Sequence, residues 1–206
     1  MSTNWFVYNG EVSETHPTKR RLLDAATAEF AAHGIAGARV DRIAAAAGVN
    51  KAQMYSYYGS KDGLFDAVFQ DNNDAILDRV PFTARDLPGY AARLYDAYIK
   101  DSTTVRLATW NRLERIPAGN LLAGEERHLS RKYGAIAEAQ QAGKLDPLIN
   151  PADIYSLVIA LSLTWGPSSV TYAASHEDSE ADHAYRRSVI EKIVARAFSD
   201  PGRDET

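Results

Sequence analysis

The stretch from residue 38 to residue 61 constrains the fold more than any other part of the chain. Residues 41 to 47 form an alanine-rich helical run, and Gly48 follows where a helix end needs a residue that accepts a left-handed backbone. Asn50 can cap a second helix, and Gln53, three residues later, completes a capping box. The stretch therefore predicts two short helices joined by a tight turn.

The second of these helices is predicted to have two different faces. At helical spacing, Met54 and Tyr58 share one face with Val49, which packs inward. The other face is small, polar and aromatic and consists of Lys51, Ala52, Gln53, Tyr55, Ser56 and Tyr57.

A polar and aromatic helix face, held at an angle to a supporting helix, is suited to reading the major groove of DNA. Gln53 can bond an adenine edge bidentately, and Lys51 can reach guanine acceptors or phosphate. Tyr55 and Tyr57 can bond phosphate oxygens. A helical hairpin with a polar outer face has the same spacing, so the spacing alone leaves both interpretations open.

The flanking residues resemble the DNA-binding domain of the TetR/AcrR family of transcriptional regulators. The resemblance covers about residues 17 to 70. It is carried by Gly34-Ile35-Ala36-Gly37, Ile43-Ala44, Ala47-Gly48-Val49-Asn50-Lys51 and Met54-Tyr55-Ser56-Tyr57-Tyr58-Gly59-Ser60-Lys61-Asp62-Gly63-Leu64. It implies an all-α fold with an N-terminal three-helix helix-turn-helix domain and a C-terminal helical ligand-binding and dimerisation domain.

One departure from the family pattern lies at the start of the first short helix. The family usually has Thr or Ser there, whereas this chain has Ala38 and Arg39, so a side-chain cap is missing. We expect the Arg39 guanidinium to contact phosphate instead.

Charge is distributed unevenly along the chain. The net charge is -4, yet residues 15 to 61 hold seven basic and three acidic residues, a net of +4, which leaves -8 for the remainder. A basic segment on an acidic chain indicates a DNA-binding domain, although chance clustering gives the same count. The predicted contacts to double-stranded operator DNA are Lys19, Arg39, Arg42, Lys51, Ala52, Gln53, Tyr55, Ser56, Tyr57 and Lys61.

Three segments are predicted. Residues 1 to 14 are polar and aperiodic, which favours a disordered arm; residues 15 to 61 form the helix-turn-helix domain; and residues 62 to 206 form the ligand-sensing and dimerisation domain. A helix from Lys61 to about Val80 is expected to link the last two mechanically. Further helices are predicted near 89–101, 103–115, 120–142, 152–174 and 183–199.

Aromatic and aliphatic side chains of the second domain are expected to line a cavity for a small hydrophobic or aromatic effector, although most such residues form ordinary core. The predicted ligand-binding residues are Phe69, Tyr95, Tyr98, Trp110, Leu113 and Trp165.

The last two long helices are apolar on more than one face, so a four-helix interface between two copies of the chain is predicted, with a wholly intramolecular core as the alternative. Its predicted residues are Leu157, Leu161, Val189 and Ile193.

Other function classes find little support. The chain has no cysteine and no nucleophile, metal or phosphate-binding motif, so we predict no enzyme, no catalytic residue, no metal and no cofactor. His176 and His183, which lie among acidic residues, are expected to belong to a solvated loop. No stretch is long enough to cross a membrane, and a cytoplasmic location is expected.

The sequence thus predicts a cytoplasmic, homodimeric, ligand-responsive transcriptional repressor. An all-α enzyme or small-molecule carrier with an incidental helix-turn-helix is the alternative from another class, and an activator is the alternative within the class. The operator sequence, the regulated genes and the effector do not follow from the sequence.

Overall fold

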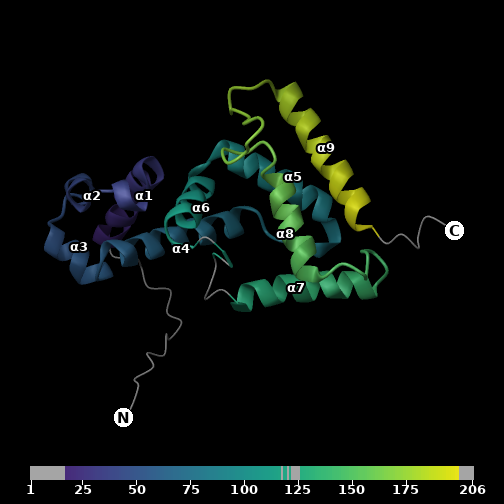
Figure 1. Ribbon diagram of the computed structural model, residues 1–206, viewed down its shortest axis with the longest axis horizontal. Coiled ribbons are helices and arrows are strands. Elements are labelled where there is room, and N and C mark those ends of the chain that lie inside the picture. The colour runs from purple at the N-terminus through teal and green to yellow at the C-terminus, as the bar shows by residue number, and fades with distance from the viewer. Residues whose placement is uncertain (1–16, 117, 120, 122–125, 200–206) are drawn as a thin grey trace, which may run out of the picture.

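The computed structural model describes residues 17–116, 118–119, 121 and 126–199, and the predicted arm at residues 1–14 lies outside them. Within the described residues the chain forms nine α-helices, one short 3-10 helix and no strand, which confirms the predicted all-α fold. Figure 1 shows α1, α2 and α3 together at one end of an elongated molecule, with the remaining helices extending away from them.

The N-terminal unit, called the head below, is built from α1 (Pro17–Gly37), α2 (Val40–Ala47), α3 (Lys51–Tyr58) and the first half of α4 (Lys61–Arg79). Its core contains Leu22, Phe30, Ile43, Met54 and Phe65, all fully buried. Gly34 interrupts α1 with a φ of 72° and a ψ of -177°, a backbone region that is essentially restricted to glycine. The helix therefore kinks sharply at Gly34 and continues to Gly37.

The turn between α2 and α3 has the predicted local chemistry. Gly48 adopts the left-handed conformation, with a φ of 66° and a ψ of 39°. The Gln53 N–H donates to Asn50 Oδ1 at 2.9 Å, and the Asn50 N–H donates to Gln53 Oε1 at 3.2 Å, so the capping box is complete. These contacts fix the turn between α2 and α3.

The rest of the chain, called the body below, contains the 3-10 helix at Ala84–Asp86, α5 (Leu87–Lys100), α6 (Thr103–Glu114), α7 (Glu126–Gln141), α8 (Pro151–Ser162) and α9 (Glu180–Phe198). The prediction of a helix over 152–174 is wrong, because α8 ends at Ser162. Pro167 cannot donate a hydrogen bond and disfavours helical backbone at Gly166, so turns and loop occupy the segment before α9.

Two helices contribute to both hydrophobic cores. The N-terminal half of α4 supplies Leu64 and Phe65 to the head core, and its C-terminal half supplies Ile76 to the body core. Similarly, α6 supplies Leu107 to the head core and Val105 to the body core. The head and the body are therefore connected by α6 as well as by α4, the helix predicted to link them. No helix within the described ranges is long and apolar enough to cross a membrane.

Candidate functional site

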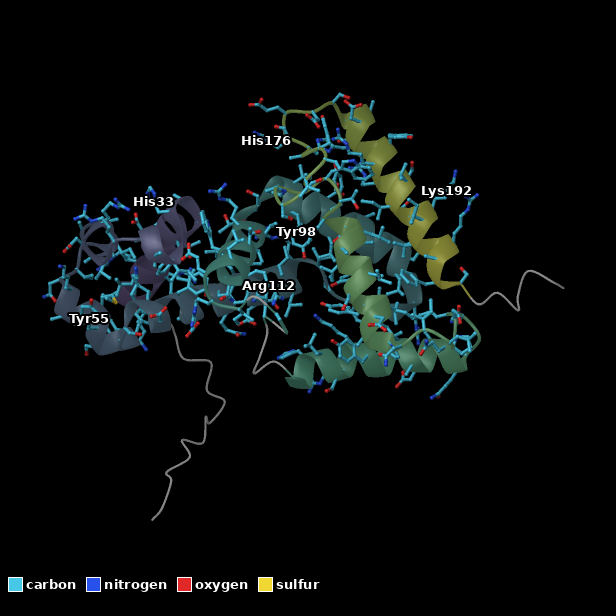
Figure 2. The ribbon with its side chains drawn as sticks, viewed as in Figure 1. His33, Tyr55, Tyr98, Arg112, His176 and Lys192 are labelled. Atoms are coloured by element: carbon cyan, nitrogen blue, oxygen red, sulfur yellow. The ribbon has the colours of Figure 1, made fainter. Side chains whose placement is uncertain are left out.

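The outward face of α3 carries five of its six predicted DNA contacts in exposed positions: Lys51, Ala52, Gln53, Tyr55 and Ser56. Figure 2 shows Tyr55 at the outer end of the head, far from the body. Tyr57 differs from the prediction, because it is half-buried and packs against the head core, with the ammonium of Lys19 5.5 Å from its ring centroid. The contact places Lys19 beside α3, at the edge of the same surface.

Gln53 is less free than a bidentate base reader would be. Its Oε1 is already the acceptor for the Asn50 N–H in the capping box, which leaves Nε2 as the group that faces solvent. A single amide donor can bond N7 of a purine, whereas bidentate reading of adenine also needs the oxygen. The structure therefore narrows the predicted role of Gln53 to a donor unless the capping box opens.

Three of the cations predicted to contact DNA are bonded to other groups of the head. Lys51 pairs with Asp41 at 2.6 Å, and Arg42 pairs with Glu29 at 2.5 Å. Lys61 Nζ donates to the carbonyl oxygens of Ala36 and Ala38, both at 3.3 Å, so it ties α4 to the end of α1 and to the residues that follow it. Each of these three cations therefore already has a partner within the protein, and a phosphate contact would have to share or replace it.

Arg39 is exposed, and its guanidinium has no polar partner within the described part of the chain. Its N–H donates to Glu29 Oε1 at 2.8 Å, so Glu29 holds the start of α2 in the absence of a capping side chain. Burial acts to raise the pKa of Glu29, but hydrogen bonds from Arg42 and from the Arg39 N–H outweigh it and hold the pKa below the ordinary 4.5. The sequence did not identify Glu29, because nothing local marks an acid ten residues before the N-cap of the helix it supports.

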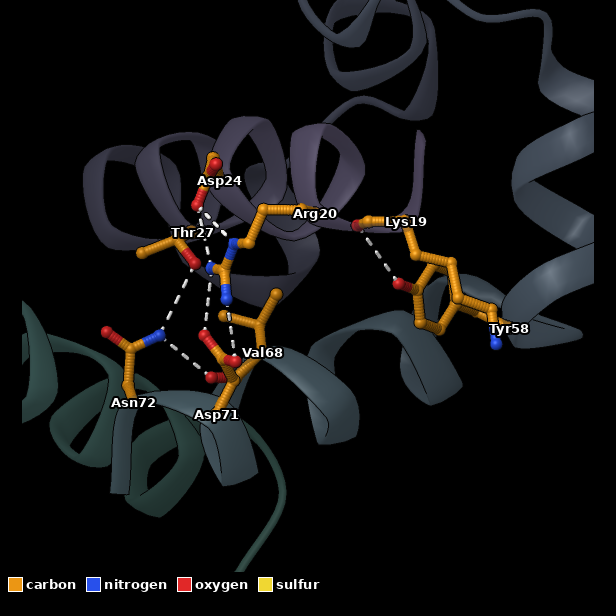
Figure 3. Close-up of polar contacts among 8 residues, drawn as sticks. All are labelled: Lys19, Arg20, Asp24, Thr27, Tyr58, Val68, Asp71 and Asn72. Carbon is orange, nitrogen blue, oxygen red and sulfur yellow. Dashed lines mark hydrogen bonds and ion pairs between the residues drawn. The ribbon is translucent and has the colours of Figure 1, made fainter. Parts of the chain in front are cut away.

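An ion-paired arginine braces α1 against α4 (Figure 3). Arg20 bonds Asp24 through Nε at 2.9 Å and Asp71 through Nη1 at 2.8 Å, and Asn72 bonds Thr27 at 3.3 Å beside it. Because α1 is fixed to α4 here, a displacement of α4 moves the whole head rather than α3 alone.

The joint between α1 and α6 uses main-chain groups on the head side. Arg106 donates to the Ala31 carbonyl through Nε at 2.9 Å and Nη2 at 2.7 Å, and Trp110 Nε1 donates to the same oxygen at 3.3 Å. Beyond the kink, the Ala36 N–H donates to Glu114 Oε2 at 2.6 Å. These contacts satisfy groups that the interrupted helix leaves without intrahelical partners.

A cavity of about 600 Å³ is lined by residues of α4, α5, α6, α7 and α8. Among the predicted ligand-binding residues, three line it: Phe69, Tyr98 and Leu113. In Figure 2, Tyr98 and Arg112, which also lines the cavity, both lie near the middle of the molecule. The volume is in the range of pockets that take small organic ligands.

The other three predicted ligand-binding residues do not line this cavity. Trp110 faces α1 and bonds Ala31. Tyr95 is directed at α9, where its hydroxyl lies 2.7 Å from His183 Nδ1, and Trp165 packs on Tyr95 with 6.1 Å between ring centroids. These rings pack against groups outside the cavity. The apolar periodicity of a helix predicts which side chains are buried, but it does not identify the helix that covers them. His183 is buried in α9 rather than placed in a solvated loop, and no three metal-binding side chains gather within the described residues.

The cavity residues that were not predicted include three whose side chains carry nitrogen: Asn73, Arg112 and Lys132. A signal was present for two of them. Asn73 follows Phe69 by four residues and precedes Ile76 by three, while Lys132 lies three residues after Leu129 and four before Ile136. Each therefore occupies a polar position within an apolar helical stripe, and each is only 8% exposed.

Two phenols of the cavity remain hydrogen-bond donors at neutral pH. Burial raises the pKa of Tyr98 and of Tyr90 well above the ordinary value of 10. Both line the cavity, so its phenols add polar groups without adding negative charge.

Exposed apolar side chains lie on both α8 and α9, which contact each other. Leu157 on α8 and Ile193 on α9 are 48% and 44% exposed, and Tyr185 on α9 is 68% exposed. The other two predicted interface residues, Leu161 and Val189, are half-buried within the chain itself. Large apolar side chains grouped on neighbouring helices mark a surface for another protein chain.

Comparison with known proteins gives two family matches. Residues 22–68 match the family described as bacterial regulatory proteins, tetR family, and residues 86–196 match the family described as tetracyclin repressor-like, C-terminal domain. The chain is 38% identical to the HTH-type transcriptional repressor SCO4008 of Streptomyces coelicolor over 146 residues, which is 70% of this chain and 76% of that protein.

The chain is also similar to solved structures of transcriptional regulators. The transcriptional regulator SCO4942 of Streptomyces coelicolor is 32% identical, with a TM-score of 0.71 over 89% of this chain and 99% of the other. A TetR family regulator from Marinobacter aquaeolei VT8 is 20% identical, with a TM-score of 0.66 over 89% of this chain and 96% of the other, and shows the shared fold.

An α3 surface held by a helix-turn-helix head, on a body with a cavity, defines a DNA-binding transcriptional regulator. The chain belongs to the TetR family. Members of this family are regulators rather than enzymes, bind operator DNA and act as dimers, so the enzyme or carrier alternative is not favoured.

Proposed function

We propose that this regulator is a repressor that binds its operator as a homodimer and leaves it when a small hydrophobic or aromatic effector enters the cavity. The relative SCO4008 is described as a repressor, which supports the direction of control. We propose residues 15–61 as the DNA-binding domain, residues 62–206 as the sensing and dimerisation domain, and the cytoplasm, where operator DNA is found, as the location.

The observation that carries the proposal is the double role of α4 and α6. Phe69 on α4 belongs to the head core and also lines the cavity. On α6, the side chains of Arg106 and Trp110 donate hydrogen bonds to α1. Thr109, which directly precedes Trp110, lines the cavity. A ligand that moves either helix therefore moves the groups that position the head.

The mechanism follows from linkage. Two α3 helices of a dimer must fit half-sites separated by about one turn of DNA or a multiple of it, so a displacement of a few ångströms weakens simultaneous docking. An effector that binds the DNA-incompetent arrangement better lowers operator affinity, and operator DNA lowers effector affinity by the same factor.

The effector response is expected to be 5- to 150-fold in operator affinity, about 1 to 3 kcal/mol of coupling. The measurement is operator affinity, for a duplex selected from random sequences, with and without saturating amounts of hydrophobic and aromatic metabolites that bind the protein. Steep loss of affinity with added salt is the accompanying check for phosphate contacts. If every compound that binds the cavity leaves operator affinity unchanged, the sensing role is refuted, while DNA binding stands.

Replacement of Gln53 by Ala tests the reading surface. We expect the base preference at one position of each half-site to relax, with a cost of about 0.5 to 1.5 kcal/mol for the preferred sequence, because a single amide donor to a base edge is lost. Arg39→Ala is the matched control, since loss of a phosphate contact weakens all duplexes alike. Selection of the same sequence by Gln53→Ala and the parent protein would show that Gln53 only caps α3.

A further inference from the structure

The cavity has a marked imbalance of charge among its described lining residues. Two of these residues are cationic, Arg112 on α6 and Lys132 on α7, and none is an aspartate or a glutamate. A cavity that binds a neutral ligand needs no buried cation, because desolvating an unpaired charge is costly.

Lys132 is the more informative of the two cations. Its side chain is buried, and its Nζ donates to the Tyr155 hydroxyl at 2.8 Å and lies 4.8 Å from the centroid of that ring. An ammonium has three donor hydrogens, so one phenol oxygen leaves it incompletely satisfied. Among the described residues it has no carboxylate partner.

Asn73 adds a second unsatisfied donor. It lies in the α4 wall of the cavity, is 8% exposed, and its Nδ2 is buried without a hydrogen-bond partner. Arg112 is half-buried in the α6 wall, where its Nη1 donates to the carbonyl oxygens of Gly119 at 2.7 Å and Ile116 at 3.2 Å rather than to an acid.

We infer that the effector is an organic anion, with an apolar or aromatic body and one acidic group, such as a carboxylate, bound by Lys132. This inference rests on the proposed function, because it names the ligand class of the same cavity. The apolar lining from α4, α5 and α6, which includes Ile76, Leu94 and Val105, holds the body of the ligand. Lys132 supplies a charge-assisted hydrogen bond, and Asn73 and the protonated phenols supply neutral donors.

The test uses two fluorescent probes with the same ring system: 1-anilinonaphthalene-8-sulfonate, an anion, and N-phenyl-1-naphthylamine, its neutral counterpart. Dissociation constants are measured for the full-length parent protein, Lys132→Met, Lys132→Arg and Lys100→Met. Lys100 is exposed at the end of α5 and does not line the cavity, so its variant controls for the change of net charge. Apolar competitors with and without a carboxylate, decanoate and methyl decanoate, then test the acidic group in a second chemical setting.

We expect Lys132→Met to weaken binding of the sulfonate and of decanoate by about 10-fold or more, the usual effect of losing a hydrogen bond to a charged group. Binding of both neutral compounds should be unchanged or tighter. Lys132→Arg should keep most of the preference for anions, and Lys100→Met should behave as the parent. Lys132→Met should also unfold at an equal or higher temperature without ligand, because it removes an unpaired buried charge.

Two results would overturn the inference. If Lys132→Met and the parent bind each anion equally while both bind the neutral compounds, the cavity is a sensor site without charge selectivity, and the proposed function survives. If no probe or competitor binds the parent protein, the cavity is not a ligand site, and the sensing part of the proposed function fails with it.

Discussion

Replacement of Ile193 or Leu157 by Asp is expected to convert the dimer into monomers. Both side chains are about half exposed in the single chain, so the monomer should tolerate the change within about 0.5 kcal/mol. In the proposed dimer each would bury an unpaired carboxylate, which costs on the order of 3 to 5 kcal/mol, and two-fold symmetry introduces the substitution twice. Sedimentation equilibrium across micromolar concentrations measures the shift.

Val170→Asp is the control for the dimer test, since Val170 is 99% exposed in the loop after α8. It should leave the dimer intact. The half-buried Leu161 and Val189 make poorer test sites, because a charge there would also disturb the fold of the single chain. A dimer that survives substitution of both Leu157 and Ile193 would show that the interface lies on another surface.

Gly34→Ala is expected to destabilise the protein by about 2 to 6 kcal/mol. The φ of 72° with an extended ψ costs a non-glycine residue roughly 1 to 3 kcal/mol. In addition, a Cβ at this position would lie 2.5 Å from Glu114 Oε1 and 2.9 Å from Trp110 Cε3, which adds an overpacking cost of about 1 to 3 kcal/mol. Unfolding in urea, followed by tryptophan fluorescence, measures the loss.

Gly37→Ala is the matched control on the same helix. Gly37 has no positive φ, and its added Cβ would meet only the Cβ of His33 at 3.5 Å, an ordinary contact. That variant should be neutral or up to about 1 kcal/mol more stable. Equal stability of the Gly34 and Gly37 variants would mean that the joint between α1 and α6 is much more pliable than its contacts indicate.

The start and end of the turn between α2 and α3 could be predicted from the sequence, because the residues that form it lie next to one another in the chain. Gly48, Asn50 and Gln53 act within one turn of the helices they end or begin, so spacing alone identifies them. The same holds for Ser60, which caps α4 by accepting from the Gly63 N–H.

Features that depend on distant neighbours could not be predicted in the same way. Glu29 supports α2 from a different helix, and the faces of Tyr95 and Trp110 are decided by α9 and α1. An apolar periodicity shows that a side chain is buried but not which helix covers it. Polar interruptions such as Lys132 are visible in the sequence, yet their meaning depends on the absence of a facing acid, which only the packed helices reveal.

The joint between α1 and α6 has a consequence for evolution by exchange of parts. Every hydrogen bond described across it joins an α6 side chain to the main chain of α1, at Ala31 or Ala36. Main-chain groups are common to all sequences, so α1 can diverge at these positions while the joint is kept, provided that a glycine permits the kink. A head with a different operator preference could therefore be grafted onto this body, and the body would pass its effector response to a new set of genes.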